Sequence, residues 1–468
     1  MEKRTKIIAT LGPASEDELT IENMIKQGVN LFRLNLKHNS LEWHKKIINR
    51  VRKISSKLRI EVGIMVDIQG PELRIETERG EGVEVKAGEL ILISNRLVLG
   101  KKTVRLSNKK VIDQIKRGDD LYVDDGQLKL QVIEKRGEII EAMAESDFVI
   151  ENMKSLNIPG RNLGLEILSN KDKEGLRLAV KEKVDFVALS FVRSKKDIED
   201  LKKQLNKLGF GGGVIAKIEN GRALKNLVSI VGLVEGVMIA RGDLGVEVPL
   251  EQLAYWQKKI IEECRKQSRP VIVATEMLAS MVEKIRPSRA EATDVANAVF
   301  DGADGLMLSE ETAVGKFGVR AVREMANICR FCEEKSQLVK IDQVAKDASE
   351  ILAEVASRII DENNEFRIAG LVVFTASGRT AKLLSAYRLK VPIIAITDKR
   401  EIAGQMRLSY GVIPYFKKFK RDKFNIGGAI FEELKRKNYF VKGDKIVVIH
   451  GNNWMNKGST SSLSIKTV

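Results

Sequence analysis

The sequence predicts an α/β protein: a (β/α)8 TIM barrel that carries an inserted all-β cap domain and is followed by a C-terminal α/β domain. Three observations lead to this prediction. Eight short apolar runs mostly alternate with helical stretches, and the segment between the third and fourth runs has short alternating strands instead of helices. A further set of apolar runs lies near the C-terminal end. A chain of 468 residues has room for about three domains of ~150 residues each.

The eight runs are predicted to be the barrel strands because they are short, rich in β-branched residues and closed by a glycine or a polar residue. Barrel strands are buried on both faces, since helices cover the outside and side chains fill the inside, so they need continuous apolar runs. The runs are Lys6 to Leu11, Val29 to Leu36, Val62 to Ile68, Phe186 to Phe191, Val214 to Ile218, Val237 to Ala240, Val271 to Ala274 and Leu306 to Leu308. The stretches Glu251 to Gln267 and Arg289 to Phe300 are predicted to be two of the helices.

The predicted domain division places the barrel in residues 1–71 and 158–340, the cap domain in 72–157 and the C-terminal domain in 341–468. The cap segment has short alternating strands, turn signals such as those from Gly118 to Gly126, and little helix. Insertions of this kind in barrel loops often act as lids. The last domain has apolar runs that are predicted to be strands, at Leu371 to Phe374, Ile393 to Ile396, Val412 to Phe416 and Ile446 to Ile449.

Composition and charge exclude several classes of protein. With 43% hydrophobic and 31% charged residues, the chain is neither disordered nor collagen-like, and its three cysteines cannot build a disulfide framework. The net charge of +16 is densest near Lys417 to Arg421, but acidic residues are interleaved there and stacking aromatics are lacking. We therefore favour a solvated basic face over a nucleic-acid site.

Targeting and metal-binding signals are also weak. No secretory leader is evident, and no run approaches the ~20 apolar residues of a membrane helix, so we expect a cytoplasmic protein without a membrane partner. Cys329 and Cys332 form a CxxC pattern, but the second pair of a zinc site is missing. Buried thiols are the preferred interpretation of these cysteines.

Polar residues that close the predicted barrel strands are the candidates for chemistry, because the active site of such a barrel lies at the carboxyl ends of its strands. These candidates are Arg33, Asn35, Asp67, Lys217, Glu219, Arg241 to Asp243, Thr275 and Glu310 to Thr312. Lys217 and Glu219 share one strand face, and Glu219 with Asp243 offers oxygen ligands for one hard cation. A purely structural ion-pair network is the alternative, and spacing alone leaves both open.

The same residues lie in motifs that resemble the pyruvate kinase family over essentially the whole chain. The matching segments are Thr5 to Ser15, Arg33 to Asn35, Asp67, Gly70 to Arg74, Tyr122 to Gly126, Asn157 to Gly160, Ala216 to Asn220, Ala240 to Gly245, Ala274 to Leu278, Arg289 to Glu291 and Asp301 to Asp304. The resemblance implies phosphoryl transfer from phosphoenolpyruvate to ADP, giving pyruvate and ATP. It also implies a homotetramer.

The resemblance further implies roles for single residues. Lys217 and Arg33 would neutralise the transferring phosphoryl group, the backbone around Arg241, Gly242 and Asp243 would hold the substrate carboxylate, and Thr275 would lie beside the enolate carbon. Mg²⁺ would bind Glu219 and Asp243. Residues near the nucleotide would be Arg74, His38 and Lys171, although a structural histidine is the alternative for His38.

The monovalent-cation site of the family departs from its usual pattern here. Asn35, Asp67 and the carbonyl of Ile68 are available, but Lys37 replaces a neutral hydroxyl residue, so the need for K⁺ stays open. We hypothesise that the Lys37 ammonium takes the place of K⁺, with those three groups as its oxygen partners. Glu72, which often becomes lysine in potassium-independent relatives, is retained and would balance Lys37. The alternative is that Lys37 points outward to nucleotide phosphate or solvent.

A hydroxyl-rich loop in the last domain is the candidate regulatory site. The family uses this loop for phosphorylated effectors, and the matching residues are Thr375, Ser377, Gly378, Arg379 and Thr380. A simple helix cap is the alternative. The stretch His450 to Trp454 lacks the arginine that some fructose bisphosphate-activated members place nearby, so the identity of the effector stays open.

Two rival functions remain at this point. An aldolase or lyase acting on pyruvate or oxaloacetate would use the same barrel and metal, but a lid over a nucleotide has no evident role there. A basic RNA-binding protein would not explain why polar residues cluster at the strand ends.

Overall fold

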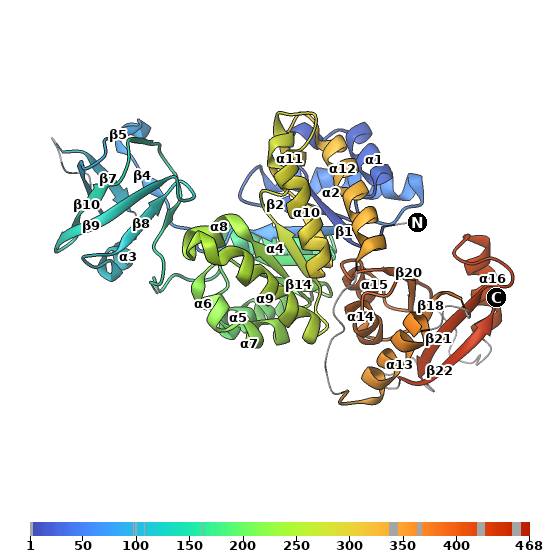
Figure 1. Ribbon diagram of the computed structural model, residues 1–468. Coiled ribbons are helices and arrows are strands. Elements are labelled where there is room, and N and C mark those ends of the chain that lie inside the picture. Colours follow the sequence, from blue (N-terminus) through green and yellow to red (C-terminus); the bar gives the residue numbers. More distant parts are fainter. Residues whose placement is uncertain are drawn as a thin grey trace.

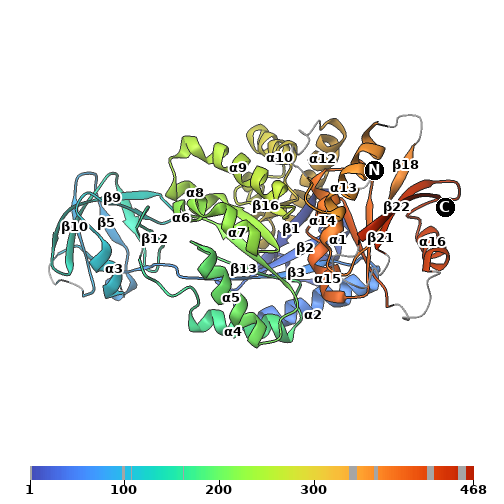
Figure 2. The same cartoon turned by 90° about the horizontal axis from the view of Figure 1, so that it is seen from below.

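The computed structural model describes residues 3–96, 98, 101–106, 108–161, 163–336, 345–362, 367–418, 426–451 and 460–468. Its parts lie in a row: the barrel is in the middle, the β-rich insertion is at one end and the C-terminal α/β part is at the other (Figures 1 and 2). Among the residues described, no helix combines the length and the apolar composition needed to cross a membrane.

A closed parallel barrel forms the centre, with strand order β1-β17-β16-β15-β14-β13-β3-β2, which confirms the predicted fold class. Its strands are β1 (Lys6–Thr10), β2 (Leu31–Asn35), β3 (Gly63–Ile68), β13 (Phe186–Leu189), β14 (Gly213–Ile218), β15 (Gly236–Ala240), β16 (Val271–Ala274) and β17 (Gly305–Leu308). The strand that we predicted from Phe186 to Phe191 ends at Leu189 in the structure. Phe191 has a φ of 54°, which is incompatible with a strand.

Helices surround this barrel and seal its outer face. They are α1 (Glu18–Gln27), α2 (Leu41–Leu58), α4 (Asn170–Lys181), α5 (Lys195–Lys207), α6 (Gly221–Lys225), α7 (Leu227–Leu233), α8 (Arg241–Glu247), α9 (Leu253–Lys266), α10 (Arg289–Asp301), α11 (Glu310–Ala313) and α12 (Gly318–Lys335), with the 3-10 turns η1 (Pro13–Ser15), η3 (Leu250–Gln252) and η4 (Ala279–Val282). A Ser288 and Glu291 capping box starts α10, and Gly302 with φ 94° ends it. The predicted helix from Glu251 begins as η3 and continues as α9.

Two apolar layers hold the barrel together. Alternate strand residues pack inward as a closed core that includes Ile8, Met65, Phe186 and Ile215, while the others pack outward against the helices. Leu408, from the C-terminal part, is also fully buried in this inner core. It lies against Gly236 and Gly305, which begin β15 and β17, so it plugs the end of the barrel where the strands begin.

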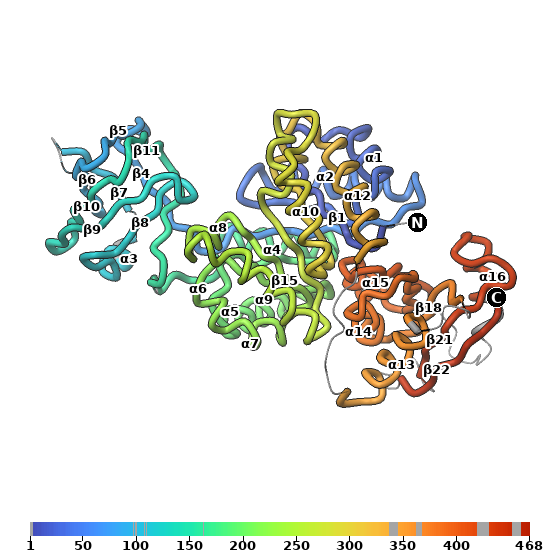
Figure 3. The backbone as a smooth tube through the Cα atoms, in the orientation of Figure 1, coloured from blue at the N-terminus to red at the C-terminus, as the bar shows by residue number. Residues whose placement is uncertain are grey.

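The insertion is built on a 7-stranded sheet with order β12-β8-β9-β10-β6-β7-β4 and a small β11-β5 pair. Its elements are β4 (Ile75–Glu76), η2 (Glu78–Gly80), β5 (Val83–Val85), β6 (Leu90–Ser94), β7 (Thr103–Leu106), α3 (Lys109–Gln114), β8 (Asp120–Val123), β9 (Leu128–Arg136), β10 (Ile139–Ala144), β11 (Phe148–Ile150) and β12 (Leu156–Asn157). The chain leaves the barrel after β3 and returns before α4 (Figure 3).

The C-terminal part is a 5-stranded sheet with order β20-β19-β18-β21-β22 and helices against it. Its elements are α13 (Ala348–Glu362), β18 (Ile368–Phe374), α14 (Arg379–Ala386), β19 (Ile393–Thr397), α15 (Arg400–Met406), β20 (Val412–Phe416), α16 (Ile426–Arg436), β21 (Lys445–Gly451) and β22 (Thr460–Thr467). The edge strand β22 has no counterpart among the predicted strands, because its mostly polar, partly exposed residues lack a continuous apolar run.

Several expectations from the sequence concern residues at the limits of what is described. The domain boundaries at 71/72, 157/158 and 340/341 stay predictions, and the last of them lies outside the described residues. The segments Phe419 to Arg421 and Asn452 to Trp454, which the sequence analysis discussed, also lie outside them. The three cysteines are buried and unpaired, as predicted.

Candidate active site

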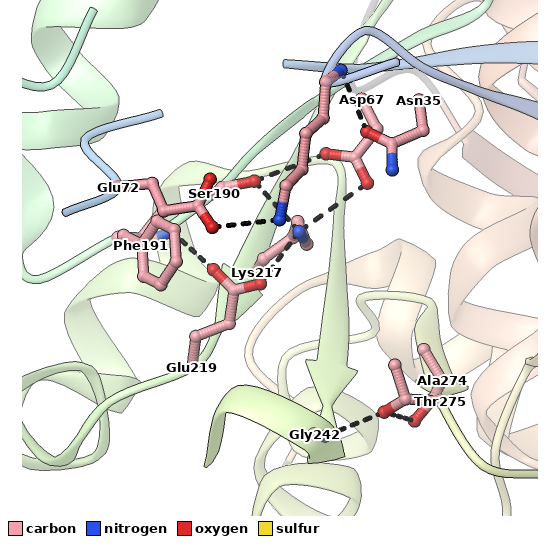
Figure 4. Close-up of polar contacts among 12 residues, drawn as sticks. Asn35, Asp67, Glu72, Ser190, Phe191, Lys217, Glu219, Gly242, Ala274 and Thr275 are labelled. Atoms are coloured by element: carbon pink, nitrogen blue, oxygen red, sulfur yellow. Dashed lines mark hydrogen bonds and ion pairs between the residues drawn. The ribbon is translucent and has the colours of Figure 1, made fainter. Parts of the chain in front are cut away.

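The carboxyl ends of the barrel strands bring most of the predicted site residues together. In the parallel register Asn35 of β2 lies opposite Asp67 of β3, and Ile68 lies opposite Leu189 of β13. Ala216 of β14 also pairs with Leu189, so Lys217 emerges beside the residue that follows β13, Ser190. Figure 4 shows Lys217 between Asp67, Ser190 and Glu219.

Lys217 is the buried centre of this cluster. Its ammonium donates a 2.9 Å hydrogen bond to the Ser190 hydroxyl and lies 2.8 Å from Glu219 Oε1 and 3.6 Å from Asp67 Oδ2. Burial opposes the charged form, but the carboxylates of Asp67 and Glu219 outweigh it, so the pKa of Lys217 is raised. The side chain therefore stays positively charged although it is almost completely buried.

Arg33 supplies a second cation at the same carboxylate. Its Nε donates to Asp67 Oδ2 at 2.7 Å, and its Nη1 donates to Thr10 Oγ1 at 3.2 Å. Burial tends to raise the pKa of Asp67, but Lys217 and Arg33 lower it overall, so this carboxylate stays ionised. One buried anion therefore holds two cations at this end of the barrel.

Glu219 and Asp243 form the acidic side of the cluster. Glu219 Oε2 accepts a 2.5 Å hydrogen bond from the Phe191 amide, and its buried Oε1 lies 2.8 Å from the Lys217 ammonium. Desolvation and then the charge of Glu219 raise the pKa of Asp243 to about 7. Two carboxylates that repel each other fit a cation-binding role.

The number of ligands also restricts the metal. Within the part of the chain that the structure describes, no group of three or more His, Cys, Asp or Glu is placed to hold a metal ion. A metal ion that takes three or more of its ligands from such side chains therefore does not suit this site. Mg²⁺ does, because it is commonly bound through one or two carboxylates and takes its remaining ligands from water and substrate phosphates.

Arg241, Gly242 and Thr275 build the rim opposite Lys217. The Gly242 amide donates to Thr275 Oγ1 at 2.9 Å, and that hydroxyl donates to the Ala274 carbonyl at 2.6 Å. The Arg241 guanidinium donates to the Thr275 carbonyl at 2.7 Å and pairs with Asp294 at 2.7 Å. Arg241 therefore stabilises the turn that follows β16. Thr275 has φ 67°, a costly conformation for a β-branched residue.

The predicted nucleotide residues gather near the loop after β2. Lys171 donates to the Lys37 carbonyl at 3.2 Å, and Arg74 lies 2.8 Å from Glu72 Oε2. The His38 carbonyl accepts a 2.8 Å hydrogen bond from the His44 ring. Partial burial and then the nearby charge of Lys37 lower the pKa of the His38 imidazole.

Lys37 does not have the partners that we expected. Its ammonium lies 2.9 Å from Glu72 Oε1, and only its backbone amide contacts Asn35, at 3.2 Å. Asp67 is held by Arg33 and Lys217, and the Ile68 carbonyl accepts a 2.9 Å hydrogen bond from Ser190. The expected set of Asn35, Asp67 and Ile68 is therefore corrected to Glu72 as the charged partner of Lys37, because the other groups already have donors.

The sequence did not lead us to two polar residues that contact Lys217 and Arg33. Ser190 links Lys217 to Ile68, and Thr10 holds Arg33 while donating to the Leu308 carbonyl at 2.9 Å. Both stand where a barrel strand ends, so the rule that found the other candidates applies to them too. By contrast, Glu311 accepts hydrogen bonds from the amides of Leu278 and Ser309 and serves the fold.

The candidate regulatory loop opens α14. Thr375 Oγ1 accepts a 2.9 Å hydrogen bond from the Gly378 amide, and Gly378 has φ 76°. The Thr380 hydroxyl lies 3.0 Å from that of Thr460 on β22. Arg379 is paired with Asp347 at 2.8 Å and with Glu350 at 2.7 Å. Ser377 is partly exposed beside these groups.

Comparison with known proteins gives one consistent result. The profile described as "Pyruvate kinase, barrel domain" matches residues 2–322, and "Pyruvate kinase, alpha/beta domain" matches 353–466. The chain is 37% identical to a pyruvate kinase of Thermococcus litoralis over 420 residues, covering 88% of each chain. It is 34% identical to one of Staphylococcus aureus over 471 residues, covering 100% of this chain and 80% of the relative. A crystal structure of a pyruvate kinase from Cryptosporidium parvum has 31% identity and a TM-score of 0.91, covering 99% of this chain and 96% of that one.

The fold and the site thus define a TIM-barrel phosphotransferase whose charged centre lies at the carboxyl ends of the strands. The chain belongs to the pyruvate kinase family. Its glycolytic reaction transfers the phosphoryl group of phosphoenolpyruvate to ADP and yields pyruvate and ATP. Members of the family generally depend on Mg²⁺. This membership decides against the aldolase or lyase and the RNA-binding alternatives.

Proposed function

We propose that Lys217 and Arg33 neutralise the phosphoryl group during its transfer from phosphoenolpyruvate to ADP. The observation that carries this proposal is the buried Asp67 carboxylate that holds both cations, at 2.7 Å from Arg33 and 3.6 Å from Lys217. Phosphoryl transfer needs positioning and charge neutralisation far more than covalent chemistry, and fixed charges in a largely buried site provide both. An assay of ATP formation from phosphoenolpyruvate and ADP in Lys217 variants tests it.

Glu219 and Asp243 are the proposed holders of Mg²⁺. When bound, the ion supplies charge neutralisation for the phosphoryl oxygens. The amides around Arg241, Gly242 and Asp243 receive the substrate carboxylate, and the Gly242 amide then exchanges its contact with Thr275 Oγ1 for one with substrate. Thr275 orients a water or relays a proton to the enolate carbon, because a threonine hydroxyl is too weak an acid to donate by itself. Arg74, His38 and Lys171 contact the nucleotide.

Lys37 is the proposed replacement for the monovalent cation. Its ammonium has the same unit charge as K⁺ and is paired with Glu72 at 2.9 Å. A lysine that is already paired with a carboxylate needs no cation from solution, so the wild-type turnover is expected to be the same in K⁺, Na⁺ or a bulky organic cation at constant ionic strength.

Lys37→Ser is therefore expected to create a K⁺ requirement. The variant leaves Glu72 without its ammonium and restores a hydroxyl, so turnover should fall in Na⁺ and recover in K⁺. Titration of activity with K⁺ measures this. Lys45→Ser, at an exposed position of α2, is the matched control and should behave as wild type. Strong K⁺ activation of the wild-type enzyme contradicts the proposal.

A phosphorylated effector is the proposed ligand of Thr375, Ser377, Gly378 and Thr380, with Arg379 released from Asp347 and Glu350 to assist. Ser377→Asp is expected to remove the activation and to spare basal activity, because it puts a like charge where the phosphate sits. Activity measured across sugar phosphates and nucleotides tests this, with Ser56→Asp on α2 as the control. If Ser377→Asp responds as wild type does, the regulatory site lies elsewhere.

Assembly and location complete the proposal. We propose a cytoplasmic homotetramer with the barrel in 1–71 and 158–340, the cap in 72–157 and the regulatory domain in 341–468. Family membership supports the oligomeric state, which sedimentation of the full chain tests.

A further inference from the structure

Two linkers join the cap to the barrel (Figure 3). The outgoing linker, residues 69–72, follows β3, and the returning linker, residues 158–161, follows β12. On the cap side of the linkers the two chain segments pair with each other: the Leu156 amide donates to the Leu73 carbonyl at 3.0 Å, and the Ile75 amide donates to the Lys154 carbonyl at 2.9 Å. The position of the cap on the barrel is therefore set where the linkers meet the barrel.

A buried carboxylate holds the outgoing linker at that point. Asp172, in the first turn of α4, is 1% exposed, and its Oδ1 accepts hydrogen bonds from the amides of Gln69 at 2.9 Å and Gly70 at 3.3 Å. Gly70 has φ 70°, and a Cβ at this position would lie 3.0 Å from the Ser190 carbonyl oxygen. The linker therefore makes a tight turn against the barrel, in a conformation that glycine allows.

The other oxygen of Asp172 caps its own helix. Asp172 Oδ2 accepts hydrogen bonds from the Ser169 amide at 2.9 Å and the Ser169 hydroxyl at 2.7 Å, as part of a capping box. The capping box uses only Oδ2, so the hydrogen bonds of Oδ1 to the linker add nothing to the helix end. They fix the linker relative to α4.

Both cations that we propose for the nucleotide are connected to this linker. Lys171 precedes Asp172 in the first turn of α4. Arg74 lies just beyond the linker, and its guanidinium is 2.8 Å from Glu72 Oε2. The same oxygen accepts a 3.3 Å hydrogen bond from the side chain of Gln69, whose backbone amide is held by Asp172. Asp172 therefore adjoins one of these cations in the chain and reaches the other through the linker.

The space beside the linkers is not filled by packing. A cavity of about 90 Å³ lies between them and the barrel, and its lining includes residues of both linkers and Glu247 at the end of α8. Burial raises the pKa of Glu247, although the amides of Gly221 and Gly160 donate hydrogen bonds to its carboxylate. Gly160 belongs to the returning linker. Hydrogen bonds to carboxylates of the barrel thus hold the linkers beside an open cavity.

We propose that Asp172 is a positioning residue for nucleotide binding. By fixing the outgoing linker, it sets where Lys171 and Arg74 stand when the cap lies over ADP. This inference rests on the proposed function, in which these two cations contact the nucleotide. The proposed contacts of phosphoenolpyruvate come from the ends of other strands, so Asp172 should matter for ADP and not for phosphoenolpyruvate.

Asp172→Ala is expected to raise the KM for ADP by ~10-fold or more and to change the KM for phosphoenolpyruvate by less than about 2-fold, because only the nucleotide cations are displaced. Ser169→Ala is the matched control, since it weakens the helix cap and keeps both contacts to the linker. It should lower the melting temperature and leave the KM for ADP unchanged. Steady-state kinetics with each substrate varied in turn, together with thermal unfolding, measure these effects.

Two further variants and one independent readout complete the test. Amide hydrogen exchange in the segment of Gln69 and Gly70 should be faster in Asp172→Ala than in Ser169→Ala. If Asp172→Ala does not fold, Gln69→Ala replaces it, because it breaks the contact with Glu72 that leads to Arg74, and it should also raise the KM for ADP. Lys171→Met tests the proposed nucleotide role by itself.

The outcomes separate this inference from the proposed function. If Lys171→Met raises the KM for ADP and Asp172→Ala does not, the positioning role is overturned. If Lys171→Met leaves that KM unchanged, the proposed role of Lys171 fails, and Asp172→Ala still decides the positioning role through Arg74. The positioning role is also overturned if the KM values for both substrates rise together, or if Ser169→Ala has the same effect as Asp172→Ala.

Discussion

Lys217→Met is expected to lower phosphoryl transfer from phosphoenolpyruvate to ADP by ~10²–10³-fold or more. Methionine keeps the length of the side chain but removes the charge that lies 2.8 Å from Glu219 and 3.6 Å from Asp67. Charge that is fixed in a buried site before the reaction stabilises the transition state without reorganisation. The loss should therefore appear mainly in kcat, as measured by a coupled assay of pyruvate and ATP formation.

The fold should survive this substitution. Asp67 keeps its 2.7 Å ion pair with Arg33, and the Glu219 carboxylate keeps the Phe191 amide as a donor. Circular dichroism and thermal unfolding check that the variant is folded, and Lys203→Met, at an exposed position of α5, controls for loss of a lysine. Near-native turnover of a folded Lys217→Met enzyme would remove Lys217 from the proposed phosphoryl site.

Glu219→Gln is expected to raise the Mg²⁺ concentration needed for half-maximal activity by ~10–100-fold, which is the range seen even for groups one step removed from a metal. The amide has nearly the size of the carboxylate, so the Phe191 amide still finds an oxygen acceptor. Lost charge is therefore the main change. Activity should return only in part at high Mg²⁺, because the neutral amide is a poorer ligand for a hard cation.

A matched control separates a metal ligand from a buried acid of the same rim. Glu311 is 2% exposed and holds the amides of Leu278 at 2.9 Å and Ser309 at 2.7 Å. Glu311→Gln should lower the melting temperature and leave the Mg²⁺ dependence unchanged. An unaltered Mg²⁺ requirement in Glu219→Gln would show that Glu219 does not ligate the ion.

The sequence alone determined the architecture of the barrel. Its strands are buried on both faces, so composition marked all eight of them, and the alternation of runs with helical stretches indicated parallel order. Knowing that active sites lie at strand ends then selected Arg33, Asp67, Lys217 and Glu219. The edge strand β22 escaped prediction because it is mostly polar and partly exposed.

The partners of each side chain were decided only by the tertiary structure. Lys37 and Glu72 are 35 positions apart, and nothing local indicates that their charges lie at 2.9 Å while Asp67 is taken by Arg33 and Lys217. The same holds for Asp304 and Arg388, which pair at 2.6 Å because the C-terminal part docks on the barrel. Local sequence encodes burial and backbone conformation, whereas pairing between distant side chains depends on strand register, barrel closure and domain docking.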